Sequence, residues 1–193
     1  MKKFYNYLFL VLLTISTLSY ADDYGDFKIS GMSIGDSLLK HYSIDQILNA
    51  KNYDDYPSDM KFRIIDIFED NKFYDAMQFY IKPNDKNFII QSLNGRKIFK
   101  NIDDCYIEKK KLESELSALF ASAEKYEQEK RKHKDDPTGK STYTSTFFTF
   151  NSGGRSSITC YDQRGEFNNR VNIGVSIQSK LVADWVDSNY GTE

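Results

Sequence analysis

The chain has 193 residues, of which 26 are basic and 28 acidic, so its formal net charge is −2 at pH 7. A mildly acidic surface gives no electrostatic basis for binding nucleic acid or anionic lipid, because both interactions depend on clustered Lys and Arg. Aromatic side chains make up 15% of the residues, enough to build a substantial buried core.

The N-terminal 21 residues predict a secretory signal peptide. Lys2 and Lys3 supply positive charge, and residues 7–15 form an apolar run. This run is too short to cross a bilayer, which takes roughly 18 apolar residues or more. The segment ends in small side chains, which a signal peptidase recognises, so we expect cleavage after Ala21. The mature protein, residues 22–193, would then be soluble in the periplasm or secreted, with no stable membrane insertion.

The first half of the mature chain is typical of helix followed by sheet. Two short helices are expected within residues 31–50, because Asp36 or Ser37 can cap the first, and Ser43 with Gln46 forms a capping box for the second. Runs dense in aromatic and β-branched residues then predict an antiparallel meander of three strands, at residues 61–68, 73–81 and 88–99. Inside the third run, Asn94-Gly95 favours a tight turn or a bulge.

The second half is expected to open with the longest helix. Asp103 or Asp104 can cap it, and its apolar face has Leu112, Leu116 and Leu119 at helical spacing. We expect this helix to continue through residues 125–134, whose positive charge would suit a helix C-terminus. Three more strands and a final helix capped by Ser179 follow, with the strands at residues 143–151, 155–162 and 170–178 and a hairpin turn at 152–154.

These elements predict an α+β fold in the order helix, three strands, long helix, three strands, short helix. The mature length suits one domain. Because the layout repeats, the domain could consist of two helix-plus-antiparallel-sheet halves, residues 31–101 and 102–193.

Cys105 and Cys160 are expected to form a disulfide. An even, minimal pair of cysteines in an exported chain is more often a structural disulfide than a metal site or a nucleophile. Cys105 lies on the apolar face of the long helix, and Cys160 follows Ile158 by two residues, on the same side of its strand. Free buried thiols and a catalytic or metal-binding role remain as alternatives.

Two short motifs match catalytic or binding patterns without the structural context that those patterns need. Gly139-Lys140-Ser141 ends like a phosphate-binding loop, but the residue five positions before Gly139 is not glycine, and a strand is expected to follow. Ser33 lies within a Gly-x-Ser-x-Gly pattern that is better explained as a helix start. We therefore assign no catalytic, cofactor-binding or metal-binding residue.

Two resemblances extend this interpretation. The pattern of residues 27–39, together with residues 139–141 and 160–162, resembles a family of small exported proteins of AT-rich marine bacteria, which has no known activity to carry over. The helical pair after Gly31-Met32 resembles the start of the helix-helix-sheet module of β-lactamase-inhibitor-like proteins and small outer-membrane assembly lipoproteins. That resemblance implies helices packed on an antiparallel sheet. The lipid-bearing cysteine of the lipoproteins is absent here.

We expect an exported binding or interaction module of the cell envelope rather than an enzyme. Its partner would be an envelope protein or a small ligand, held on an open sheet face such as the Thr- and aromatic-rich side of residues 143–151. A small-molecule or hydrolytic enzyme of unrecognised type is the alternative. A concave pocket with convergent polar groups would favour the enzyme, and a broad exposed aromatic patch would favour the binding module.

Overall fold

The computed structural model describes residues 27–52, 61–69, 73–134, 136–165 and 169–190. The expected signal peptide and its cleavage site lie outside the described residues. Among the described helices, none combines the length and apolar character needed to cross a lipid bilayer.

Eight strands form a single antiparallel sheet in the order β1-β2-β3-β4-β8-β7-β6-β5. The strands are β1 (Lys51–Asn52), β2 (Arg63–Phe68), β3 (Ala76–Ile81), β4 (Ile90–Phe99), β5 (Glu124–Lys132), β6 (Thr142–Thr149), β7 (Arg155–Asp162) and β8 (Val171–Gln178). Because β4 pairs with β8, strands from the two halves of the chain join in one sheet. The α+β class is confirmed, with four strands rather than three in each half.

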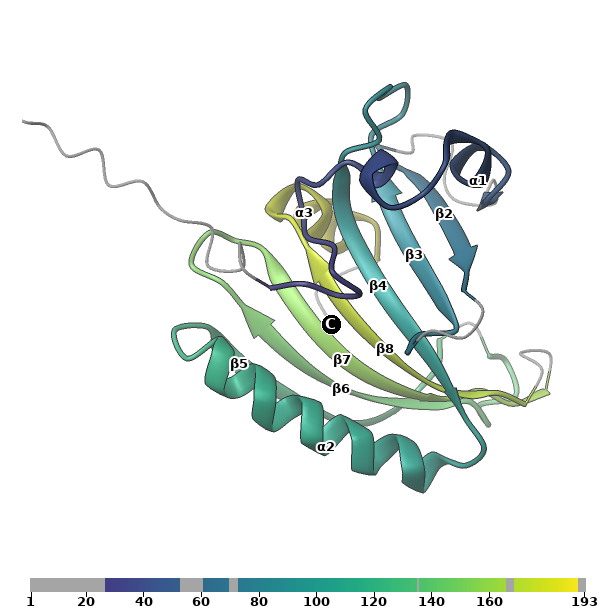
Figure 1. The fold of residues 1–193 in the computed structure, drawn as a ribbon. Helices are drawn as coiled ribbons and strands as arrows, with labels where there is room; N and C mark the ends of the chain where they lie inside the picture. Colours follow the sequence, from purple (N-terminus) through teal and green to yellow (C-terminus); the bar gives the residue numbers. More distant parts are fainter. Residues whose placement is uncertain (1–26, 53–60, 70–72, 135, 166–168, 191–193) are drawn as a thin grey trace, which may run out of the picture.

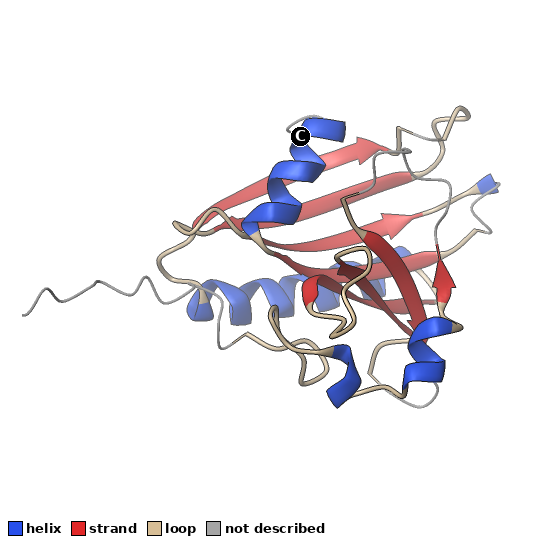
Figure 2. Ribbon diagram, turned by 90° about the horizontal axis from the view of Figure 1, so that it is seen from above, coloured by secondary structure: helices blue, strands red, loops and turns tan. Residues whose placement is uncertain are grey.

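The helices lie on both faces of this sheet. They are η1 (Leu38–Lys40), α1 (Ile44–Leu48), α2 (Ile102–Leu119) and α3 (Lys180–Tyr190). The N-terminal segment with η1 and α1, together with α2, covers one face, and α3 lies across the other (Figures 1 and 2). The sheet is therefore the middle layer, and its two faces have different surroundings.

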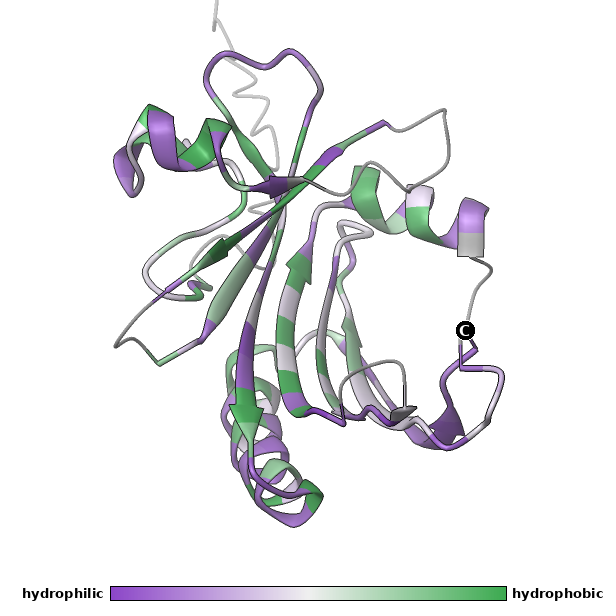
Figure 3. Cartoon of the chain, turned by 90° about the vertical axis from the view of Figure 1, so that its right-hand side faces the viewer, coloured by the Kyte–Doolittle hydropathy of each residue, from purple (hydrophilic) through white to green (hydrophobic). Residues whose placement is uncertain are grey.

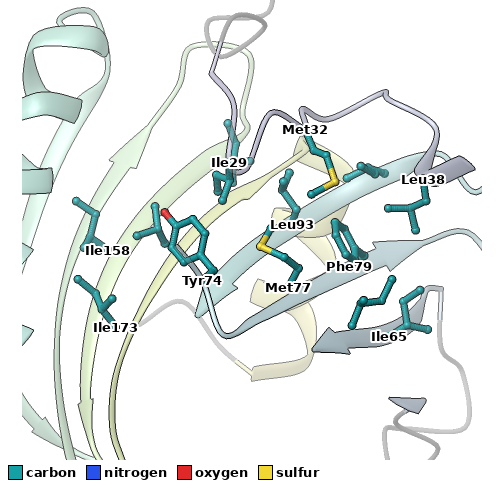
Figure 4. Packing of buried hydrophobic residues seen from close by; sticks show 14 of the residues in the cluster. Ile29, Met32, Leu38, Ile65, Tyr74, Met77, Phe79, Leu93, Ile158 and Ile173 are labelled. Atoms are coloured by element: carbon teal, nitrogen blue, oxygen red, sulfur yellow. The ribbon is translucent and has the colours of Figure 1, made fainter. Parts of the chain in front are cut away.

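The main hydrophobic core lies between the sheet and the layer formed by α2 and the N-terminal segment. Alternate residues of the strands point into it, as Figure 4 shows for Phe79, Leu93 and Ile173, while Ile29 and Met32 cover them from the N-terminal segment. A small separate cluster of Phe62, Val182 and Trp185 holds α3 on the opposite face. The large core therefore holds the sheet from one face, and most of the α3-side face takes no part in a hydrophobic cluster.

Several expected local signals are confirmed. Ser37 caps η1, and the Ser43–Gln46 capping box opens α1. The Ser179 hydroxyl accepts a hydrogen bond from the Val182 N–H at the start of α3. The N-cap of α2 was placed wrongly: Asn101 accepts from the Asp104 N–H, and the two expected aspartates lie in the first turn, where negative charge stabilises a helix.

The prediction that the long helix continues through residues 125–134 is wrong. The helix ends at Leu119, and the segment returns as β5, the edge strand beside β6. Glu, Gln, Lys and Arg favour helix, but only by tenths of a kcal/mol per residue, so pairing with an otherwise unpaired strand overrides that preference. Charged side chains along an edge strand also discourage pairing with another molecule.

The expected turn or bulge at Asn94-Gly95 is not formed. Both lie inside β4, which runs unbroken from Ile90 to Phe99. A Cβ atom on Gly95 would be 2.8 Å from the ring of Tyr74. Glycine is therefore needed here for the close approach of a buried ring, rather than for its turn-forming freedom.

The disulfide between Cys105 and Cys160 is present, as expected from the sequence. It links the first turn of α2 to β7, and both cysteines are fully buried. The far end of α2 is held by aromatic contacts, because the ring of Phe120 packs edge-on against Phe27, Phe148 and Phe150. The long helix is thereby fixed to the sheet at both ends.

Candidate functional site

Strand alternation gives the sheet one apolar and one polar face. In β8, Val171, Ile173, Val175 and Ile177 enter the core, and the intervening residues face the α3 side. The strands curl around this second side, as Figure 3 shows. A groove with a volume of about 430 Å³ lies there, within the roughly 300–1,000 Å³ typical of ligand sites.

The floor of this groove is built from three adjacent rows of side chains that cross the sheet. Each row follows the pairing register from strand to strand. The first contains Tyr80, Ser92, Gln178, Arg155 and Thr149; the second contains Gln78, Asn94, Ser176, Ser157 and Phe147; the third contains Gly174, Thr159 and Ser145. Most of these side chains are neutral donors or acceptors of hydrogen bonds.

Hydrogen bonds between neighbouring strands fix several floor side chains. The hydroxyl oxygens of Ser157 and Ser176 are 2.8 Å apart, and those of Ser145 and Thr159 are 2.9 Å apart. The Ser92 hydroxyl donates to the Ile177 carbonyl. Each hydroxyl has both donor and acceptor capacity, so a hydroxyl pair still offers hydrogen-bonding sites to a ligand.

Two amide side chains on this face lack partners. Within the part of the chain that the structure describes, the Asn94 Oδ1 atom is buried and accepts no hydrogen bond. The Asn94 amide lies close over Gly174, the neighbouring floor residue, where a Cβ atom would be only 3.1 Å from Oδ1. Gln128, opposite Ser145 on the same face, is only 4% exposed, and neither of its amide atoms is paired. Buried polar atoms normally have partners, so these two amides are unsatisfied groups on the groove side of the sheet, and a ligand would reach them only if the side chains turned.

Aromatic rings flank the polar floor. Tyr126 and Phe147 stack at the β5–β6 side with 6.4 Å between ring centroids and 19° between ring planes. Further along β6 and β7, Tyr143 and Tyr161 lie 6.1 Å apart, and both contact His133. The groove therefore combines a hydrogen-bonding floor with flat apolar surfaces at its side.

Charged groups lie at the margins of the groove. Near α3, Arg155 donates to Asp187 and to the side chain of Gln178. His133 and Lys134 lie at the end of β5. Asp187 is the one carboxylate among the described residues that line the groove. Arg155 is the one charged residue of the three floor rows, and its charge is balanced by Asp187.

The sequence-derived motifs lie elsewhere or have structural roles. Gly139-Lys140-Ser141 belongs to the turn between β5 and β6, where the Asp136 carboxylate accepts from the N–H groups of Thr138 and Ser141. The Ser33 hydroxyl donates to the Phe27 carbonyl. The described residues contain no group of three or more His, Cys, Asp or Glu side chains placed to hold a metal ion.

The sequence pointed to only part of the groove. The expected Thr- and aromatic-rich side of residues 143–151 divides by alternation: Tyr143, Ser145 and Phe147 line the groove, while Thr146 and Phe148 face α2. The floor residues of β7 and β8 were missed. Their signal in the sequence is the polar set that alternates with the apolar residues of each strand.

Comparisons with protein-family models, with curated proteins and with solved structures found no match to this chain. The chemistry of the groove is therefore the basis for proposing a function.

Proposed function

We propose that the protein is a binding module that holds a small polar ligand in the groove on the α3 side of the sheet. The observation that carries this proposal is the concave floor, rich in hydroxyl and amide side chains and flanked by aromatic rings. Ligand sites are typically concave and contain a few well-placed polar groups beside apolar surface.

The composition of the groove supports binding over hydrolysis. Glycoside hydrolysis generally uses two carboxyl groups facing each other across the bond, one to protonate and one to attack or activate water. Among the described lining residues only Asp187 has a carboxylate, and it already forms an ion pair with Arg155 at 3.0 Å. This arrangement supplies hydrogen bonds without the pair of carboxyl groups that glycoside hydrolysis needs.

We place this binding activity outside the cytoplasm. The support is the signal-peptide pattern of residues 1–21 together with the buried disulfide, since disulfides persist in oxidising compartments. N-terminal sequencing of the protein from a periplasmic or secreted fraction is expected to begin at Asp22. A full-length form retained in the cytoplasm would contradict this location and leave the groove proposal standing.

Saturation-transfer NMR tests the binding function, because it detects weak ligands. The probes are four mixtures: uncharged oligosaccharides, dipeptides, nucleosides and fatty acids. One class is expected to receive saturation from the native protein. Ser157→Trp, which adds bulk to the groove floor, should abolish the signal, whereas Glu127→Trp, on the α2 side of β5, should retain it. No transfer to any mixture, or transfer that survives Ser157→Trp, would contradict the proposal.

A further inference from the structure

We infer that the groove takes a short, uncharged oligosaccharide; this inference rests on the proposed binding function and names its ligand. A sugar ring presents hydroxyl groups around its rim and apolar C–H groups on its two faces. Its recognition therefore requires neutral donors and acceptors beside flat aromatic surfaces. The groove has both within one concave surface.

The floor suits the hydroxyl rim of a sugar. The Ser157–Ser176 and Ser145–Thr159 pairs present hydroxyl groups that can donate and accept, as sugar hydroxyls also do. The Asn94 amide lines the same surface and would offer a donor and an acceptor to sugar hydroxyls on turning toward the groove. Neutral partners of this kind satisfy each other without the desolvation cost of a charge.

The aromatic side of the groove suits the apolar faces of a sugar. Tyr126 is 51% exposed although it stacks on Phe147, so one face of this nearly parallel pair remains available. Exposed aromatic surface is costly in water and is a common feature of binding sites. The Tyr143–Tyr161 pair provides a second ring surface further along β6 and β7, which favours an oligosaccharide over a single sugar.

Competing ligand classes fit less well. A phosphorylated ligand would need cations on the floor, but Arg155, the one cation in the three floor rows, is paired with Asp187. An extended peptide binds by adding a strand to a sheet edge. The strands beneath the groove, β4, β8 and β7, are paired on both sides, and the edge strand β5 carries charged side chains that discourage strand addition. A fatty acyl chain would leave the polar floor unsatisfied.

Isothermal titration calorimetry with cellotetraose, maltotetraose and N-acetylchitotetraose tests the inference. We expect binding of at least one of these probes. Tyr126→Ala should weaken that binding by about tenfold or more, the effect of losing one well-placed aromatic contact. Phe73→Ala is the matched control, because Phe73 is an aromatic residue of equal exposure, 52%, that does not line the groove. The affinity of the Phe73→Ala variant for the same probe should stay within about twofold of that of the native protein.

The outcomes separate this inference from the proposed function. If dipeptides or nucleosides bind in a Ser157-dependent way and the three oligosaccharides do not, the sugar assignment is overturned and the binding function stands. If no probe class binds, both fail. Equal losses in Tyr126→Ala and Phe73→Ala would also overturn the sugar assignment, because the groove aromatics would then have no specific role. Circular dichroism of each variant checks that it folds.

Discussion

Asp136 organises the turn between β5 and β6 through its carboxylate. One oxygen accepts from the N–H and hydroxyl of Thr138, and the other accepts from the N–H of Ser141 at 2.6 Å. These hydrogen bonds, chiefly those from Thr138, hold the pKa of Asp136 well below its usual value. The ionised carboxylate therefore replaces any phosphate as the anion at Gly139-Lys140-Ser141.

This lowered pKa predicts a specific acid dependence. The stabilisation is fully present above the unfolded-state pKa of about 3.8 and is lost as the pH falls toward the lower folded-state pKa. Asp136→Asn should lower the melting temperature by a few degrees near neutral pH, and the difference from the native protein should shrink below about pH 4. Thermal unfolding between pH 2 and 7 measures both curves. A difference that is constant across that range would contradict this role.

Tyr74 predicts a change at the alkaline end. Burial, aided by the negative charge of Glu108, raises the pKa of Tyr74 to about 12. Because an unfolded tyrosine ionises near pH 10, stability should fall as the pH rises from about 10 to 12. Tyr74→Phe should reduce this fall, whereas Tyr126→Phe, at an exposed position, should leave it unchanged. Denaturant unfolding at several pH values in this range measures the free energy of unfolding of the three proteins. An equal fall of this free energy with pH in all three would contradict the role of Tyr74.

Gly95 predicts a steric effect beneath the same ring. A methyl group at this position would be 2.8 Å from Tyr74, so Gly95→Ala forces the buried ring to move. Overpacking of this kind costs about 1–3 kcal/mol. The loss should nearly disappear in a Gly95→Ala, Tyr74→Ala double variant relative to Tyr74→Ala alone. Urea unfolding of the four proteins in this cycle measures the coupling, and simple additivity would be evidence against the contact.

At the scale of elements, α2 depends on its attachments more than on an apolar face. Cys105 and Leu116 are buried, but Leu119, expected on the same face, is 54% exposed. The helix is held mainly at its ends, by the Cys105–Cys160 disulfide and by the aromatic contacts of Phe120. Loss of either attachment should therefore loosen the whole helix.

The disulfide closes a loop with a sequence separation of 55 residues. Restricting the unfolded chain by a loop of this size is worth about 4 kcal/mol in the chain-entropy model. Cys105→Ala with Cys160→Ala should lower the free energy of unfolding by about that amount and raise the denaturant sensitivity, because the unfolded state exposes more surface. Urea unfolding measures both quantities. A loss below about 1 kcal/mol would show that the loop is already restricted in the unfolded state.

The contrast between β8 and β5 explains which elements the sequence predicts. Strict alternation in β8 reports burial of one face, so its pattern predicts a strand directly. In β5 only Gln128 is buried, and the exposed Lys, Glu and Arg residues have helix-favouring chemistry. Its strand state comes from pairing with β6, a long-range contact that local composition does not encode.

At the scale of the whole molecule, the disulfide pair could be predicted but the groove could not. Cysteine count, compartment and helical spacing identify Cys105 and Cys160 without coordinates. The groove needs Asn94 of β4 beside Ser176 of β8, residues brought together only by the β4–β8 pairing that unites the two halves. Polar residues on alternating strands are also what an ordinary solvent-facing sheet would show, so curvature and register had to be known.

The central claim, that this groove is the ligand-binding surface, is tested most directly by mapping backbone amide shifts in a ¹⁵N–¹H spectrum during titration with the oligosaccharide that binds. The account predicts that the largest changes cluster around Asn94, Ser157 and Ser176, with amides along the outer side of α2 unaffected. Changes confined to α2 or to the N-terminal helices, or shifts that leave these floor residues unchanged at saturation, would contradict it.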